Sequence, residues 1–308
     1  MKPTVINLIN IGDRYLRRAG LITHSISSER LLEFVLKESG ESVPTVNTAV
    51  YGIPGLYLDR SLMVERGKRR KFFAYLRKRA KRFPLQYLIG EASFMDFAFA
   101  VDRSCLIPRP ETELLIEHVL RELLKEIPSG EARIIDIGTG CGNIALSLSR
   151  YLPFAEVWAT DVSKKALSLA KANAVRLGLK TDRFILGDLF GGIPNVRFEC
   201  VVSNPPYLSE SDMKALEGEV LFEPRDALLG GEKGTETIVR IAEESRARLT
   251  DRGLLAFEIG MGQAKSVRMC LRRLGYSSIK TIADYAGIQR VVLARFRRKR
   301  KITNPQSS

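Results

Sequence analysis

A short motif in the second half of the chain combines a side-chain amide with a rigid backbone. It follows an apolar run directly and reads Asn204-Pro205-Pro206-Tyr207. Proline cannot donate to a sheet ladder, so the pattern predicts a buried strand that stops at Asn204. The Asn204 oxygen and the Pro205 carbonyl can accept both hydrogens of a planar NH2 group, on which Tyr207 can stack. The motif therefore predicts a clamp for a planar NH2; the alternative is a plain proline-rich end to a strand.

A glycine-rich segment supplies a candidate cofactor loop. Its core is Gly138, Thr139, Gly140, Cys141 and Gly142, which lie between an apolar run and a helical pattern. Alternate glycines let the backbone turn tightly and let a ligand approach the main chain. A strand, loop and helix in this order bind a ligand at the carboxyl edge of a parallel sheet. The glycines alone leave NAD, FAD and S-adenosylmethionine open.

Three acidic residues extend the predicted cofactor site, and the first of them favours S-adenosylmethionine. Asp136 precedes the glycines, Asp161 ends the next apolar run and Asp188 ends the third. Asp161 can accept both ribose hydroxyls, a feature that NAD and S-adenosylmethionine folds share, and Asp188 suits a position beside the adenine. Asp136 would face the ammonium and sulfonium of the methionine end, whereas an acid there would disfavour a pyrophosphate. The alternative for Asp161 is an acid at a helix N-terminus, just ahead of Ser163.

The loop and the clamp together indicate methyl transfer to a planar nitrogen. An amide or aromatic amine nitrogen is a poor nucleophile because its lone pair is delocalised, and no histidine follows the motif to act as a base. Two oxygen acceptors would orient the nitrogen toward the methyl group and favour the positive charge that develops on it. We expect Asn204, Pro205 and Tyr207 to be catalytic, Pro206 to help bind the acceptor, and Asn204 to border the cofactor as well.

From residue 133 onward, strand-like and helix-like segments alternate. This alternation predicts a parallel α/β sheet with helices on both faces. The predicted strands cover residues 133–138, 156–162, 183–190, 200–206, 253–260 and 290–296. The predicted helices cover residues 142–152, 163–179, 234–249 and 263–276, and a further helix at 111–127 precedes the first strand.

The remainder of the chain divides by composition. Residues 1–88 carry helical patterns at 27–39 and 70–82, separated by a turn region at 51–60, and predict a small helical domain. Residues 89–110 alternate apolar side chains and then carry two prolines, which indicates a β-hairpin or linker. A catalytic domain at 111–297 and a disordered basic tail at 298–308 complete the expected organisation.

The composition favours a protein with acidic partners and argues against metal-binding, disulfide-rich, membrane-spanning and secreted proteins. The net charge of +14 favours acidic partners, although the basic runs at 67–82 and 295–301 could be a solvated helix face and a disordered tail. Four separated cysteines and two histidines argue against a zinc site or disulfide framework, and fit a reducing, cytoplasmic compartment without a bound metal. We expect neither a membrane span nor a secretion signal, because no run of 18 apolar residues occurs.

The combined motifs resemble the peptide-chain release factor glutamine N5-methyltransferase family, of the HemK/PrmC type. The resemblance runs from about residue 80 to the end of the last strand, and weakly includes the helical N-terminus. It implies an α/β fold, the S-adenosylmethionine-dependent methyltransferase Rossmann-like sheet, mostly parallel with an antiparallel last strand. The segments that carry it are RFPLQYLIGEASFMDFAFAVDRSCLIPRPETELLIE, DIGTGCGNIALSL, VVSNPPYLSE, FEPRDALLGGEKG and FEIGMGQAKSVRMCLRRLGYSSIKTIADYAGIQRVVLAR.

The resemblance also implies roles for individual residues. The loop Gly138–Gly142 would hold the methionine side of S-adenosylmethionine, and Asp161 its ribose. Leu189 stands where the family often has an aromatic residue beside the adenine, so that stacking would be weaker or would come from Phe190. Asn204–Tyr207 would hold the glutamine that is methylated.

The implied substrate is the Gln of the Gly-Gly-Gln tip of class 1 release factors. The cofactor S-adenosylmethionine would be converted to S-adenosylhomocysteine, and Arg109 and Glu111 would close the site. The helical domain would help to hold the release factor, and we expect the enzyme to be a monomer. The basic run at 67–82 is our candidate for an acidic surface of the partner, through Arg69, Arg70, Arg77 and Arg79.

Two other functions share some of these features. A nucleic-acid base methyltransferase, acting on N6 of adenine or N2 of guanine, would use the same loop and clamp, and the charge of +14 suits phosphate contacts. The flanking motifs fit the glutamine family instead, and no recognised nucleic-acid-binding module is present, so nucleic acid is not an expected partner. A protein that only senses S-adenosylmethionine would have no need of the acceptor clamp.

Overall fold

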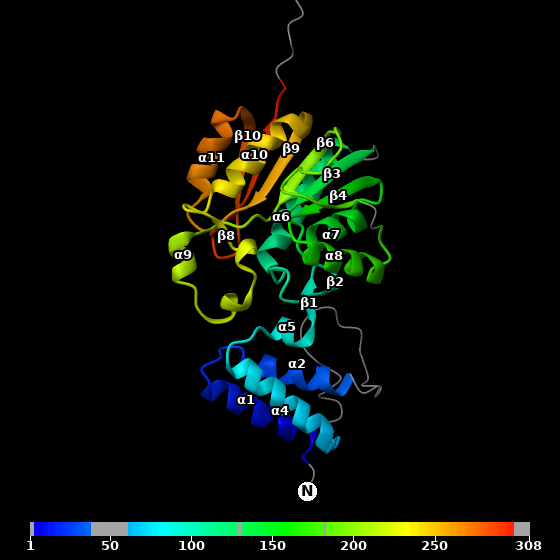
Figure 1. Cartoon of the computed structure of the whole chain (residues 1–308), viewed down its shortest axis with the longest axis vertical. Helices are drawn as coiled ribbons and strands as arrows, with labels where there is room; N and C mark the ends of the chain where they lie inside the picture. The colour runs from blue at the N-terminus through cyan, green and yellow to red at the C-terminus, as the bar shows by residue number, and fades with distance from the viewer. Residues whose placement is uncertain (1–2, 38–60, 128–130, 181–182, 299–308) are drawn as a thin grey trace, which may run out of the picture. The chain divides into compact units, whose positions relative to one another are not determined.

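The computed structural model describes residues 3–37, 61–127, 131–180 and 183–298. The chain forms two compact units (Figure 1). The first contains Met1–Arg103 and Leu216–Glu223, and the second contains Ser104–Ala215 and Pro224–Ser308. The turn region predicted at 51–60 lies outside the described residues, as does the predicted tail beyond residue 298.

The first unit is built on helices α1 (Val5–Arg18), α2 (His24–Lys37), α4 (Arg66–Ala80) and α5 (Leu85–Ile89). Helix α2 starts earlier than the predicted Ser27 cap, because Ser27 and Ser28 are both buried and Ser28 Oγ donates to the Ile9 carbonyl at 2.9 Å. The unit also contains the hairpin of β1 (Glu91–Phe94) and β2 (Phe97–Ala100), as the alternating phenylalanines predict.

The basic helix α4 does not expose all of its charges. Arg79 is only 2% exposed, so the interpretation of 67–82 as a wholly solvated face is wrong at this residue. Residues Leu216–Glu223, which include the short helix η1 (Gly218–Phe222), belong to the same unit as Arg79. The Arg79 guanidinium donates hydrogen bonds to Thr23 Oγ1, Ser27 Oγ, the Phe83 carbonyl and Glu219 Oε1.

The second unit contains the main sheet, whose strand order is β10-β11-β9-β6-β3-β4-β5. The strands are β3 (Ala132–Ile137), β4 (Ala155–Asp161), β5 (Phe184–Leu186), β6 (Phe198–Ser203), β9 (Leu249–Glu258), β10 (Tyr276–Ala283) and β11 (Gln289–Phe296). From β9 to β5 the neighbours are parallel, whereas β11 is antiparallel to both β9 and β10. This topology confirms the predicted α/β fold and its antiparallel last strand.

Helices cover both faces of this sheet (Figure 1). Helices α10 (Glu236–Arg248) and α11 (Ala264–Arg273) share one buried core with Ile135, Val201 and Phe257 of the sheet. Helices α6 (Pro110–Glu126), α7 (Asn143–Tyr151) and α8 (Lys164–Arg176) lie over the other face. Within the described residues, no helix has the length and hydropathy needed to cross a membrane.

Strand β10 was not predicted, and the predicted strand at 183–190 is too long. Strand β10 pairs only with β11, at the edge of the sheet, and its polar residues give it no continuous apolar run. Strand β5 ends at Leu186, after which Gly187 to Gly191 form a tight turn with Leu189 at a φ of 50°. Asp188 therefore lies in a turn beyond the strand.

The chain after β6 leaves the sheet and returns beside it. It continues through β7 (Leu208–Ser209), α9 (Glu210–Lys214), η1, η2 (Arg225–Ala227) and β8 (Leu229–Gly231). Strands β7 and β8 pair in parallel. The returning limb therefore lies against the residues that follow Asn204.

Candidate active site

A cleft of about 530 Å³ lies in the second unit, at the carboxyl ends of β3, β4 and β6. The glycine loop borders it through Gly138, Thr139 and Gly140, and Asp161 and Asn204 border it from the next two strand ends. Parallel strands bring their carboxyl ends to one edge of a sheet, which is where open α/β folds bind ligands. The predicted cofactor loop and the predicted clamp thus share one cavity.

The predicted site residues separate into two groups. Those that line the cleft are Gly138, Thr139, Gly140, Asp161, Asp188, Leu189, Asn204, Pro205 and Pro206. Those that lie outside its lining are Asp136, Cys141, Gly142 and Tyr207, together with Arg109 and Glu111.

The loop conformation requires its glycines. Gly138, Gly140 and Gly142 have φ angles of 72°, 57° and 86°, in the left-handed region that other residues rarely adopt. The N–H groups of Gly138 and Thr139 both donate to the Thr160 carbonyl at 2.9 Å. These hydrogen bonds fix the loop against the end of β4, and the loop borders the cleft in this position.

Asp136 lies behind this loop. Its side chain is fully buried, and Oδ2 accepts a hydrogen bond of 2.6 Å from the Thr139 hydroxyl. Burial raises the pKa of Asp136 to about 7, although the Thr139 hydrogen bond acts in the opposite direction. The carboxylate can therefore influence a ligand through Thr139 and through its charge, without lining the cleft.

Asp161 has two structural roles. Its oxygens accept hydrogen bonds of 2.8 Å from the backbone N–H of Gly140 and of Ser163, so it connects the loop to the start of α8. Burial raises its pKa. Each carboxylate oxygen has a further lone pair for a ribose hydroxyl. The two interpretations of Asp161 are therefore compatible, because the same side chain caps the helix region and borders the cleft.

The residues expected near the adenine differ in exposure. Leu189 lines the cleft, and Asp188 forms an ion pair of 2.7 Å with Arg240, which lines it too. Phe190 is buried in the sheet core and is not part of the cleft lining. The packing of Phe190 therefore gives no support to the hypothesis that it replaces the missing aromatic residue at the adenine.

The clamp is connected to two residues that the sequence did not indicate. Asn204 Nδ2 donates to Thr112 Oγ1 at 3.1 Å, and the Thr112 hydroxyl donates to Glu258 Oε2 at 2.6 Å. The Tyr207 hydroxyl approaches the other oxygen of Glu258 at 3.5 Å. The one sequence signal for Glu258 is an acidic residue at the end of an otherwise apolar strand.

Neighbouring segments hold the clamp backbone in place. A Cβ atom at Gly230 would lie 2.4 Å from the Pro206 carbonyl oxygen, so only glycine allows β8 to approach this closely. The Gln263 side chain donates to the Tyr207 carbonyl at 2.8 Å. A Cβ atom at Gly260 would lie 3.0 Å from Cδ2 of the Tyr207 ring, so glycine leaves the space that this ring needs.

The cleft fits S-adenosylmethionine. The buried carboxylate of Asp136 suits a cationic ligand group, and Asp161 offers the acceptors that two ribose hydroxyls require. Gly138 and Gly140 leave room beside the main chain, because a Cβ at Gly138 would meet no atom within 4 Å. Among the described residues, no group of three or more His, Cys, Asp or Glu residues could hold a metal ion.

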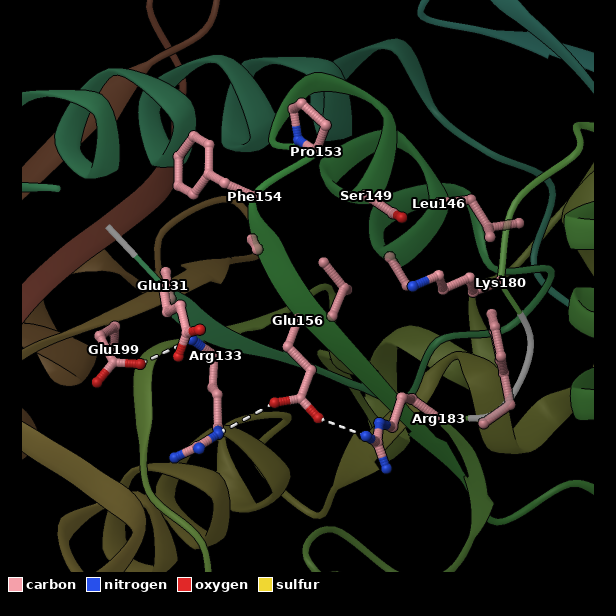
Figure 2. A pocket seen from close by; sticks show the side chains of 15 residues that line it. Glu131, Arg133, Leu146, Ser149, Pro153, Phe154, Glu156, Lys180, Arg183 and Glu199 are labelled. Atoms are coloured by element: carbon pink, nitrogen blue, oxygen red, sulfur yellow. Dashed lines mark hydrogen bonds and ion pairs between the residues drawn. The ribbon is translucent and has the colours of Figure 1, made fainter. Parts of the chain in front are cut away.

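A second pocket, of about 410 Å³, lies at the opposite edge of the sheet (Figure 2). Figure 2 shows Glu156 between two arginines, with ion pairs of 3.1 Å to Arg133 and 2.8 Å to Arg183. Glu199 accepts a hydrogen bond of 2.7 Å from the Arg133 backbone. These charged side chains pair with each other at the amino ends of the strands, whereas Asn204 follows the carboxyl end of β6.

Comparisons with known proteins agree with this site. Residues 111–257 match the family model described as methyltransferase small domain. The release factor glutamine methyltransferase of Thermodesulfovibrio yellowstonii is 39% identical over 219 residues, which are 71% of this chain and 78% of the relative. The enzyme of the same name from Vibrio cholerae is 36% identical over 274 residues, covering 86% of this chain and 94% of the relative.

Among solved structures, the catalytic domain of hMettl16, determined with an RNA hairpin, superposes with a TM-score of 0.51. It is 15% identical and covers 78% of this chain and 85% of that one, so this likeness shows the fold alone. The sequence relatives, by contrast, cover most of their own length at 36–40% identity. The chain belongs to the release factor glutamine methyltransferase family.

Proposed function

We propose that the chain transfers a methyl group from S-adenosylmethionine to the side-chain amide nitrogen, N5, of the glutamine in the Gly-Gly-Gln motif of class 1 release factors. The observation that carries this proposal is the shared cleft, in which the Asn204-Pro205 clamp faces the same cavity as Gly138, Gly140 and Asp161. Family membership supports the enzyme class and the cofactor, and the clamp chemistry supports an amide acceptor.

The cofactor residues act by binding and by charge. Bound S-adenosylmethionine supplies an activated methyl group. Asp161 accepts the ribose hydroxyls, and the loop at Gly138 and Gly140 lets the ligand approach the main chain. Asp136 holds Thr139 in place and provides a negative charge behind the loop, on the side of the cationic methionine end. Leu189 supplies an apolar wall next to Asp188.

The clamp acts on the acceptor nitrogen. The Asn204 Oδ1 atom and the Pro205 carbonyl accept the two hydrogens of the glutamine NH2, which orients the nitrogen toward the methyl group. As the nitrogen lone pair is used for the new bond, positive charge develops on the N–H groups, and the two oxygens stabilise it. The sulfur–methyl bond would break with its electron pair left on sulfur, and the methylated nitrogen would release one proton to solvent water. Pro205 is buried and Pro206 has a fixed φ, so the carbonyl does not need to reorganise.

The first unit is proposed to hold the body of the release factor. Exposed arginines of α4, such as Arg70 and Arg77, border a groove with the apolar residues Leu8 and Phe73. Such a surface suits an acidic partner with apolar side chains. Arg79 is not part of this surface because it is buried.

The test is a methylation assay read by mass spectrometry. Purified protein is incubated with S-adenosylmethionine and, in parallel, with a class 1 release factor or with total ribosomal RNA. We expect one added methyl mass on the Gly-Gly-Gln peptide and none on RNA. Methylated RNA with an unmodified glutamine would overturn the proposal in favour of a nucleic-acid base methyltransferase.

Two further predictions accompany this function. We propose that the enzyme is a monomer and that it works in the cytoplasm, where release factors act. Sedimentation of the protein at several concentrations would test the first, since a dimer would double the mass. Neither property carries any step of the mechanism.

A further inference from the structure

The clamp works in only one of the two orientations of the Asn204 amide. The side chain ends in an oxygen that accepts and an NH2 group that donates. Only the oxygen can hold a hydrogen of the acceptor NH2, and a reversed amide would set donor against donor. A neighbouring group must therefore distinguish the two ends of Asn204.

Thr112 provides this distinction. Its oxygen accepts from Asn204 Nδ2 at 3.1 Å, and its single hydroxyl hydrogen is directed to Glu258 Oε2 at 2.6 Å. An ionised carboxylate can only accept, so the Thr112 hydrogen is committed to Glu258. The Thr112 oxygen is then left as an acceptor, and Asn204 must present its NH2 group there.

Glu258 occupies a position that packing alone would give to an apolar residue. It is 1% exposed, and its chain neighbours Phe257 and Ile259 are fully buried hydrophobic residues. Burying a carboxylate costs free energy unless it is hydrogen-bonded. Glu258 meets both arms of the clamp, through Thr112 to Asn204 and directly to Tyr207.

We infer that Thr112 and Glu258 are positioning residues, which hold the Asn204 amide with its oxygen toward the acceptor nitrogen. This inference rests on the proposed role of Asn204 in the clamp. We call the hydrogen bonds from Glu258 through Thr112 to Asn204 the positioning chain. It joins β9, the first turn of α6 and the end of β6, so these three elements must be correctly folded before the Asn204 amide is held in one orientation.

The positioning chain also makes the rate of methyl transfer depend on pH. A protonated Glu258 can donate to Thr112, whose hydrogen can then turn to the Asn204 oxygen and favour the reversed amide. Burial and the nearby Glu111 raise the pKa of Glu258, whereas the hydrogen bonds from Thr112 and Tyr207 and the charge of Arg290 lower it; the net result is a pKa of about 7. At saturating cofactor, kcat should therefore fall as the pH decreases below about 7.

The first test compares Thr112→Val, which has nearly the same shape without a hydroxyl, with Thr112→Ser, which keeps the hydroxyl. We expect kcat to fall roughly 10- to 100-fold in the valine variant, because the bias on the amide is lost, and to be largely retained in the serine variant. The affinity for S-adenosylmethionine should be unchanged in both. A valine variant that turns over at the wild-type rate would overturn the inference.

The second test separates positioning from a general structural effect. In an Asn204→Ala background, Thr112→Val should cause no further loss of the residual rate, since no amide remains to be oriented. A further loss of similar size, together with weaker cofactor binding, would show a merely structural role. Glu258→Gln should lower kcat and remove the decrease of kcat at acid pH. An unchanged pH profile of kcat in this variant would contradict the proposed role of Glu258.

These outcomes are distinct from failure of the proposed function. If wild-type protein methylates an NH2 group other than glutamine, the proposed substrate is wrong, and the same variants test the chain on that acceptor. If the glutamine is methylated and the variants behave as wild type, the proposed substrate is supported and the positioning role of Thr112 and Glu258 is rejected.

Discussion

At the scale of single residues, we propose that methyl transfer depends most directly on Asn204. Its side chain borders the cleft beside the glycine loop, and its Nδ2 atom donates a hydrogen bond to Thr112 Oγ1. We therefore expect Asn204 to act on the acceptor more than on the stability of the fold. A substitution at Asn204 should therefore lower turnover without weakening cofactor binding, and both quantities can be measured.

We expect Asn204→Ala to lower kcat about 100- to 1000-fold, as loss of one preorganised polar contact to a transition state does. The dissociation constant for S-adenosylmethionine, measured by calorimetry, should change less than about threefold, since the loop and Asp161 remain. An equal loss of binding and turnover would count against the assigned role. Thr112→Ser serves as a matched control, because it changes the same cluster conservatively.

Asp136 gives a second prediction, for the pH dependence of cofactor affinity. Its pKa of about 7 means that the carboxyl is largely neutral below that pH and ionised above it. A cationic ligand binds the ionised form better, so the affinity for S-adenosylmethionine should rise as the pH increases through 7 and then level off.

The control for this prediction is the product, S-adenosylhomocysteine, which has the same amino-acid group but no sulfonium charge. Its affinity should vary less over the same range. Asp136→Asn should flatten the difference between the two ligands. If both ligands respond alike in the wild type, the charge behind the loop does not act on the sulfonium.

At the scale of elements, helix α4 combines a surface with a buried anchor. Arg79 points into the first unit and binds Glu219, which lies 140 positions later in the chain. The Phe83 and Phe222 rings meet edge to face at 5.1 Å beside this pair. The segment Leu216–Glu223 is thereby fastened to the helical unit, although both of its ends continue into the second unit.

We expect Arg79→Ala to destabilise the first unit by about 3 kcal/mol, because it leaves several buried or half-buried acceptors unpaired. Arg77→Ala, an exposed residue of the same helix, should change stability by less than about 0.5 kcal/mol. Urea unfolding followed by circular dichroism measures both. Equal effects of the two substitutions would mean that the buried hydrogen bonds contribute little.

The element pattern was largely predictable. The predicted ranges for β3, α7, β4, α8, β6, α10 and α11 lie within about three residues of the observed elements, because parallel strands buried on both faces leave continuous apolar runs. Strand β10 was missed since an edge strand with alternating serines lacks that signal. The short pairing of β7 with β8 depends on Gly230, whose close approach to Pro206 no local pattern reveals.

At the scale of the whole molecule, the charge of +14 is concentrated in part on α4. If this surface holds the release factor, the double variant Arg70→Glu/Arg77→Glu should raise KM for full-length release factor about tenfold or more. The KM for a short Gly-Gly-Gln peptide should hardly change, since the peptide reaches only the cleft.

The matched control is Lys171→Glu/Arg272→Glu, which changes the net charge equally on exposed positions of α8 and α11. Its effect on KM should be small. Steady-state assays at two salt concentrations provide the measurement, because contacts between exposed charges weaken with added salt. Identical KM values for both double variants would remove the docking role of α4.

The sequence by itself predicted the family and the α/β fold, and it located the glycine loop and the Asn204-Pro205 motif. These features are encoded in short stretches, where residue type and spacing along one loop or strand carry the chemistry. Only the tertiary structure decided that Asp136 lies behind its loop, that Arg79 is buried, and that Thr112 and Glu258 join Asn204. The reason is distance along the chain: Asn204 and Thr112 are 92 positions apart, and Thr112 and Glu258 are 146 apart. Contacts of this kind arise from the packing of whole elements, which no local pattern records.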